Sequence, residues 1–288
     1  MIRNAITTFE QTRPTGWATL LLFGVTTATY VTASVVVVEG GLLNEPVAAT
    51  HGWVDEALLC SAAALLVITG GILFGIGRLK LRDVGLLVAR MPLALAVTLA
   101  LWLLAQLAAL IISLIHTGGV TLHHDWDENQ ATWVFGGLIG QLFGNALFEE
   151  TAYRGFLLPQ IYLLLAAGSL WSAKTRLIAA VAISQAFFAL MHIPIRLHQG
   201  TEPAALPPNL LATVFFGVFL CWVYLRTGNL FIAVGVHALI NKPTSLLECV
   251  FAPQHVLSIL VILMLLLWPL LTRPRGRALP LDSPLQRS

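Results

Sequence analysis

Residues 91–115 read MPLALAVTLALWLLAQLAALIISLI, an apolar block without a single Asp, Glu, Lys or Arg. A helix needs about 20 apolar residues to cross the hydrocarbon core of a bilayer, and this block is long enough. Similar blocks recur along the chain, in which 57% of the residues are hydrophobic and 10% are charged. Soluble domains carry about 25% charged residues. The sequence therefore predicts an all-α fold, a polytopic transmembrane helical bundle embedded in a lipid bilayer.

Hydropathy divides the chain into eight expected spans, near residues 17–38, 54–76, 91–115, 132–166, 177–193, 207–225, 229–242 and 255–271. The fourth stretch is too long for one straight crossing, and we expect it to bend or end at Gly155 or Pro159. The seventh stretch, between Gly228 and Pro243, covers only about 20 Å at 1.5 Å per residue. It therefore crosses with little tilt, kinks at Pro243 or fails to span.

Basic residues collect in alternate connections, as the positive-inside rule requires of a membrane protein. They precede the first span, follow the second, precede the fifth, separate the sixth from the seventh and close the chain: Arg3, Arg13, Arg78, Lys80, Arg82, Arg90, Lys174, Arg176, Arg226, Arg273, Arg275 and Arg277. The other connections are acidic or nearly neutral. This alternation predicts a multi-pass membrane protein with both termini cytoplasmic, and we expect the membrane to be the bacterial cytoplasmic membrane. The first apolar run has full spanning length and no clear small-residue cleavage site, which predicts a helix that is retained rather than cleaved.

The overall charge and the cysteines exclude other classes of protein. The net charge is only +2, and no basic run is interleaved with aromatic residues, so nucleic acid is not an expected partner. The three cysteines form no CxxC pair and lie mostly in apolar segments, which predicts small packing residues rather than disulfides.

The fourth span contains ionisable residues within the sequence FEETAYRG, residues 148–155. A charge at the centre of a bilayer costs about 2.5 to 3.5 kcal/mol, so such residues usually face a cavity or a partner. Glu150 and Arg154 are four residues apart on one helix face and are expected to form an ion pair. Glu149 points about 100° away, which makes it the better candidate for a carboxylate in a polar cavity. A purely structural Glu–Arg clamp is the alternative.

Two further polar elements lie in later spans. His192 closes the apolar segment that contains Phe188, and alone it is more typical of a packing residue than of a catalyst. His237 and Asn241 are four apart and share one helix face. Counting about 1.5 Å per residue from the expected ends of the helices places Glu149 and His192 in the outer half of the membrane and His237 nearer the inner half.

Together these residues provide what peptide hydrolysis needs: a carboxylate or imidazole that takes a proton from water, and His and Asn donors for the oxyanion. Neither Ser184 nor Ser245 has the surroundings of a serine nucleophile, so activation of water is favoured over a covalent intermediate. The spacing is not that of a standard zinc helix, and metal dependence stays open; a zinc ion would use Glu149, His192 and His237.

The ordered set Glu149-Glu150-x-x-x-Arg154, Phe188-x-x-x-His192 and His237-x-x-x-Asn241 resembles the three-motif signature of the CAAX protease and bacteriocin-processing family of intramembrane peptidases. The resemblance covers roughly residues 136–245. It implies that Glu149 activates water with help from His192, that His237 and Asn241 serve the oxyanion, and that Glu150, Arg154 and Phe188 support the site. It also implies a membrane-associated peptide or protein as substrate, lipidated or not.

With this resemblance the chain divides into four parts. Residues 1–130 hold the first three spans, 131–250 form the protease-like core with its site in helices four, five and seven, 251–272 form the last span, and 273–288 form a basic disordered tail. Two other functions stay open: a non-catalytic scaffold or bacteriocin self-immunity factor, and a proton-coupled transporter, since buried Glu and His residues also form proton relays.

Three remaining features are expected to be structural. Gly136, Gly140 and Gly144 recur every four residues and should let a neighbouring helix approach closely. The segment from His123 to Glu128 contains metal-capable side chains but is expected to be a solvated polar loop. Arg196 and His198 are expected to be ordinary interfacial residues.

Overall fold

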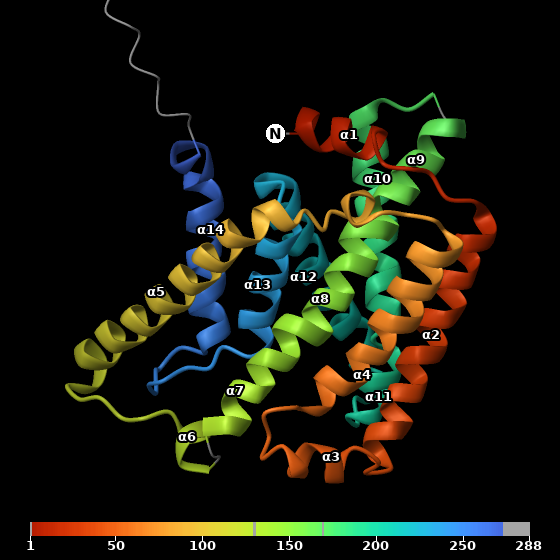
Figure 1. The fold of residues 1–288 in the computed structure, drawn as a ribbon. Helices are drawn as coiled ribbons and strands as arrows, with labels where there is room; N and C mark the ends of the chain where they lie inside the picture. Colours follow the sequence, from red (N-terminus) through yellow and green to blue (C-terminus); the bar gives the residue numbers. More distant parts are fainter. Residues whose placement is uncertain (1, 129–130, 169, 273–288) are drawn as a thin grey trace, which may run out of the picture.

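The computed structural model describes residues 2–128, 131–168 and 170–272 (Figure 1). In this part of the chain the fold is helical throughout, with one isolated antiparallel bridge between Leu122 and Leu247. The predicted basic tail, residues 273–288, lies outside the described residues. The helical elements are α1 (Ile2–Glu10), α2 (Trp17–Glu39), α3 (Asn44–Ala49), α4 (Glu56–Ala64), η1 (Leu65–Ile76), η2 (Leu81–Val84), η3 (Val88–Arg90), α5 (Met91–Thr117), α6 (His124–Glu128), α7 (Ala131–Gly140), η4 (Gln141–Asn145), α8 (Ala146–Glu149), η5 (Glu150–Leu157), α9 (Leu158–Gly168), α10 (Ala173–Leu190), α11 (Ile193–His198), α12 (Leu206–Thr227), α13 (Leu230–Asn241) and α14 (Pro253–Leu271).

Seven helical stretches of the described chain are long and apolar enough to cross a membrane, which confirms the multi-pass helical bundle. They lie at residues 17–39, 56–76, 88–117, 131–168, 173–198, 206–227 and 253–271. The eighth expected span, α13, has only 12 residues, nine of which are buried. It packs among α5, α12 and α14 in the interior of the bundle (Figure 1). A helix surrounded in this way need not present a full-length apolar face to lipid.

The long fourth stretch does not end at Gly155 or Pro159, which was one of the two predicted alternatives. It stays helical from Ala131 to Gly168, and two of its segments, η4 and η5, are π-helical. The wider π turns of η5 end just before Pro159, which has no N–H to donate to the preceding turn. Gly155 instead allows close packing, because a Cβ there would lie 2.3 Å from the carbonyl oxygen of Val84.

The glycines of α7 and η4 pack as predicted against the start of α4. A Cβ on Gly136 would lie 1.8 Å from the carbonyl oxygen of Gly52, and one on Gly140 would lie 1.9 Å from Oδ1 of Asp55. Asp55 caps α4 by accepting a hydrogen bond from the backbone N–H of Leu58 at 2.8 Å. These small residues therefore bring the second and fourth crossings together beside the site described below.

The two ends of the bundle differ in charge. Figure 1 places α1, the start of α5 and the last turn of α14 at one end, and α3, α6 and α11 at the other. The first end carries the basic connections, including Arg78, Arg90 and Lys174. At the second end, the backbone N–H of His123 donates to the carbonyl oxygen of Leu246 at 3.0 Å, which ties the two loops there together. Alternate connections thus share an end, as the charge pattern predicts.

Candidate active site

The two adjacent glutamates of the fourth crossing meet the short helix α13 at His237. Nδ1 of His237 lies 2.8 Å from Oε1 of Glu150, and Nε2 lies 3.6 Å from Oε2 of Glu149. The imidazole is buried, with 2% of its side chain exposed, whereas Glu149 retains 16% exposure. A carboxylate oxygen accepts hydrogen bonds, so Nδ1 donates to Glu150 and the Nε2 edge faces Glu149.

The predicted ion pair between Glu150 and Arg154 is present and fully buried. Nη1 of Arg154 lies 3.0 Å from Oε1 of Glu150, and both side chains are 0% exposed. Nη2 also donates to the carbonyl oxygen of Gly217 at 3.2 Å, and the guanidinium lies 4.4 Å from the ring centroid of Phe188. Glu150 is therefore fixed between a cation and an imidazole, while Glu149 is left to face a cavity.

His192 follows the last turn of α10 and is held by its own helix. Its Nδ1 lies 2.8 Å from the carbonyl oxygen of Phe188, and its ring meets the Phe188 ring edge to face at 4.6 Å. A carbonyl oxygen only accepts, so Nδ1 carries a proton, and Nε2 of the neutral ring is an acceptor. The order Phe188-x-x-x-His192 thus has a direct structural role.

A cavity of about 620 Å³ is lined by both Glu149 and His192. Asn241 also lines it. Three of the four predicted catalytic residues thus line one space, and the fourth, His237, lies behind Glu149 and contacts it. Glu149 and His237 lie at the same depth, so the prediction that they occupy opposite halves of the membrane is wrong. The reason is that α13 is a short interior helix that need not be centred in the bilayer.

Gln141 and Asn145 line this cavity and were not predicted from the sequence. Asn241 donates to Oε1 of Gln141 at 3.0 Å, and Asn145 contacts the same oxygen at 3.4 Å. Gln141, Asn145 and Glu149 recur every four residues, and three polar residues at this spacing in an apolar helix are a signal that could have indicated them. They extend the polar surface from Glu149 toward Asn241.

The opposite wall comes from the first two crossings, which were predicted to lie outside the protease-like core. From α2 and α4 the cavity receives Tyr30, Val31, Ser34, Val35, Val38, Glu56, Ala57, Cys60 and Ser61. Arg196 and His198 of α11 also line it, although they were expected to be ordinary interfacial residues, and His198 pairs with Glu39 at the end of α2. The cavity therefore reaches the end of the bundle that carries α3 and α11.

The donor atoms of Glu149, His192 and His237 are not arranged for a shared zinc ion. A zinc site brings three or four donors to about 2 Å from one ion. In the described part of the chain, the one group of three such donors within 4.8 Å of one another is His123, His124 and Asp125. Nδ1 of His237 is already engaged with Glu150.

His123 and His124 lie at the start of α6, where this segment contacts the loop before α14 at the end of the bundle. Oε1 of Glu248 accepts hydrogen bonds from the backbone N–H of His124 at 2.9 Å and lies 2.8 Å from Nδ1 of the same residue. These hydrogen bonds lower the pKa of Glu248 below its usual range. The polar side chains of this loop thus serve to join the connections that precede α6 and α14.

The buried Glu–His–Glu arrangement thus lies within a bundle of membrane-length helices. Residues 129–242 match the family model described as Rce1-like, type II CAAX prenyl endopeptidase. In this segment the chain is similar to the CAAX prenyl endopeptidases that the family model describes. No curated protein and no solved structure matches the chain.

Proposed function

We propose that the protein is an intramembrane endopeptidase in which Glu149 activates water to hydrolyse a peptide bond of a membrane-associated substrate. The observation that carries this proposal is the pair of contacts made by His237, which is fixed by Glu150 on one edge and faces Glu149 with the other. The match of residues 129–242 to the family model supports a protease, and the contacts within the site support the roles proposed below for each residue.

In the proposed reaction Glu149 takes a proton from a water molecule while the water oxygen bonds to the scissile carbonyl carbon. Nε2 of His192, which accepts hydrogen bonds, helps to orient that water. The carbonyl oxygen gains negative charge and is stabilised by the Asn241 amide and by His237, whose Nε2 donates when the ring carries both protons. Glu149 then passes its proton to the amide nitrogen, the C–N bond breaks, and a carboxylate and an amine leave.

Glu150 and Arg154 are proposed to position this machinery without touching the substrate. Glu150 fixes the tautomer and the orientation of His237, as a carboxylate does for histidine in a catalytic triad. Arg154 and Phe188 hold Glu150 in place. The apolar part of the cavity, formed by Val31, Val35 and Met191, suits a hydrophobic segment of the substrate.

The test uses purified protein in detergent with two probes: a farnesylated peptide that ends in a CAAX sequence, and the same peptide without the lipid. Wild type should cleave at least one probe, and Glu149→Ala and Glu149→Gln should abolish cleavage while keeping the wild-type thermal unfolding profile. Glu202→Gln, which removes an exposed carboxylate outside the cavity, is the matched control and should cleave normally. Retained turnover in Glu149→Ala would refute the proposed mechanism.

The physiological substrate can be sought with the same variant. Membranes that contain Glu149→Ala should retain bound substrate, which mass spectrometry of the purified complex would identify by comparison with wild type. A scaffold or immunity factor predicts a different result, because Glu149→Gln and His237→Ala would then spare the cellular effect. A proton-coupled transporter predicts uptake driven by a pH gradient in proteoliposomes.

We also propose that the basic end of the bundle faces the cytoplasm, which leaves the catalytic cavity nearer the opposite surface. This orientation follows from the clustering of Arg and Lys at one end and rests on the positive-inside rule. Cys249 lies in the loop before α14 at the other end and is partly exposed. In cells expressing Cys60→Ser with Cys221→Ser, a membrane-impermeant maleimide should label Cys249 from outside. A cysteine introduced by Lys174→Cys, with Cys249→Ser, should resist the reagent until the cells are opened, and the reverse pattern would invert the topology.

A further inference from the structure

The cavity that contains Glu149 also holds a strongly basic side chain, that of Arg196 in the short helix α11. Arg196 is the one Arg or Lys among the described residues that line this cavity. Its backbone N–H donates to the carbonyl oxygen of His192 at 3.0 Å, so Arg196 lies one helical turn beyond His192. The proposed reaction assigns no role to this cation, although it lies near the histidine that is proposed to orient water.

The guanidinium of Arg196 makes few contacts with polar groups of the protein. Nη1 donates to Oε1 of Gln199 at 3.3 Å, three residues later in the chain, and Nε is buried without a hydrogen-bond partner. Arg196 forms no ion pair with any residue that the structure describes. A buried donor without an acceptor costs free energy, which an acceptor on a ligand would recover.

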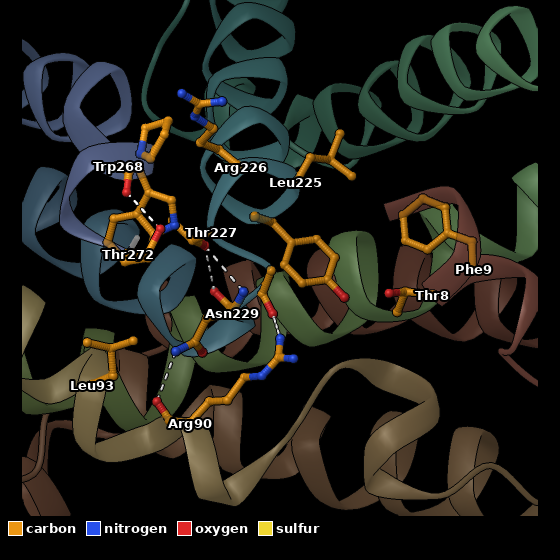
Figure 2. A pocket seen from close by; sticks show the side chains of 13 residues that line it. Thr8, Phe9, Arg90, Leu93, Leu225, Arg226, Thr227, Asn229, Trp268 and Thr272 are labelled. Carbon is orange, nitrogen blue, oxygen red and sulfur yellow. Dashed lines mark hydrogen bonds between the residues drawn. The ribbon is translucent and has the colours of Figure 1, made fainter. Parts of the chain in front are cut away.

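Two other arginines are held by stronger or more distant acceptors of the protein. Nη1 of Arg154 lies 3.0 Å from the carboxylate of Glu150. Arg90 lines a separate cavity of about 500 Å³ at the basic end of the bundle and donates to the carbonyl oxygen of Gly228 (Figure 2). The acceptor of Arg196, in contrast, is a neutral amide of its own segment. Arg196 is therefore better placed than either of these arginines to bind a group of the substrate.

The other charged side chains of the cavity leave the charge of Arg196 without a counter-ion. His198 pairs with Glu39 of α2. Glu56 lies in the first turn of α4 and lines the opposite wall, and Glu149 is the proposed base. A carboxylate that enters the cavity is repelled by these two glutamates and attracted by Arg196. The charges therefore direct a carboxylate to the wall formed by α11.

We propose that Arg196 determines substrate specificity by binding a carboxylate of the substrate; this inference rests on the proposed peptidase function. A guanidinium donates two parallel N–H groups to a carboxylate, which gives geometric selectivity as well as charge attraction. One helical turn covers about 5.4 Å and an extended peptide about 3.3 Å per residue, so the carboxylate belongs to a residue about two positions from the bond that is cut. It is either an Asp or Glu side chain or the free C-terminus of a short substrate.

The experiment measures the binding of three farnesylated peptides to the purified full chain that carries Glu149→Gln, which keeps the peptides intact. The first peptide ends in a CAAX sequence with a free carboxylate, and the second has the same sequence with a terminal amide. The third is the amidated peptide with Glu two positions after the lipidated cysteine. A hydrogen bond to a charged group is strong enough that the two acidic peptides should bind about tenfold more tightly than the amide. Adding Arg196→Gln should reduce both to the affinity of the amide.

The three peptides also identify the source of the carboxylate. Tighter binding of the first peptide alone assigns the C-terminus to Arg196, and tighter binding of the third alone assigns an acidic side chain. Equal binding of all three overturns the proposal, and this comparison holds even if Arg196→Gln fails to fold. An equal loss for all three peptides in Arg196→Gln would show a structural role without selectivity, which overturns the proposal as well.

Matched variants separate this site from general charge attraction and from the chemistry. Arg82→Gln removes an equal but exposed charge outside the cavity and should keep the preference for acidic peptides. Arg196→Lys keeps the charge without the paired donors and should keep part of the preference. With Glu149 restored, Arg196→Gln should raise KM for the acidic peptides and leave kcat nearly unchanged. If no peptide is cleaved, the peptidase function fails, while the binding preference still tests Arg196 separately.

Discussion

Replacing Arg154 with methionine should destabilise the protein more than replacing Arg154 and Glu150 together. Arg154→Met keeps much of the side-chain volume but removes the ion pair at 3.0 Å and the contact with the ring of Phe188. Glu150 is then left as a buried carboxylate without a cation. Arg154→Met combined with Glu150→Gln removes that isolated charge, while the amide oxygen can still accept the hydrogen bond from His237.

The magnitude follows from the burial of both partners. Removing one member of a buried ion pair costs about 3 to 5 kcal/mol, because the other charge stays desolvated. The hydrogen bond from Nδ1 of His237 to Glu150 at 2.8 Å remains, so we expect Arg154→Met to cost about 3 kcal/mol, near the lower end. Residues in direct contact show coupling energies up to about 3 kcal/mol, and we expect about 2 kcal/mol for this pair.

The assay is reversible unfolding in mixed micelles, followed by tryptophan fluorescence, for wild type, both single variants and the double variant. Lys174→Met, which removes an exposed cation, serves as the control and should change the free energy of unfolding by less than about 0.5 kcal/mol. If the two single effects add to within about 0.5 kcal/mol, the two residues are energetically independent and the reasoning fails.

Three other outcomes can be measured on the same preparation. Gly136→Ala should lower the free energy of unfolding by about 1 to 3 kcal/mol, because its Cβ would lie 1.8 Å from the carbonyl oxygen of Gly52, whereas Gly16→Ala, with no atom within 4 Å, should be nearly neutral. Hydrogen bonds from His124 lower the pKa of Glu248, so its ionised form stabilises the fold at neutral pH, and the stability difference from Glu248→Gln should vanish as the pH falls below about 4. Chelation with EDTA or 1,10-phenanthroline should leave peptide cleavage intact. If chelation abolishes cleavage and added zinc restores it, the conclusion that Glu149, His192 and His237 do not share a zinc ion is wrong.

The membrane fold was predictable because hydropathy and charge alternation are properties of the chain itself. Apolar blocks such as residues 91–115 are expected to lie in lipid because they carry no charged side chain. When successive blocks cross the membrane, the basic connections come to lie at one end. The continuous winding of the fourth crossing was not predictable in the same way. Whether Pro159 breaks a helix depends on how the preceding turns are wound, and π turns accommodate it here.

The candidate site was predictable where residues lie on one helix. The spacing of Glu150 and Arg154 predicted their contact, and the offset of Glu149 indicated that it faces elsewhere. Contacts between helices could not be obtained in this way. The placement of His237 between both glutamates depends on where α13 packs, and the cavity wall formed by Tyr30 and Cys60 depends on how α2 and α4 fold over the fourth crossing.

The cavity is lined by two separate segments of the chain, which can change independently. The residues proposed to carry out the reaction lie within the segment that matches the family, residues 129–242, whereas much of the opposite wall lies between Tyr30 and Ser61. Changes in the earlier segment can reshape what the cavity admits while leaving the reacting groups untouched. Exchanging α2 and α4 between relatives would then transfer preference for a peptide without transferring the chemistry that cuts it.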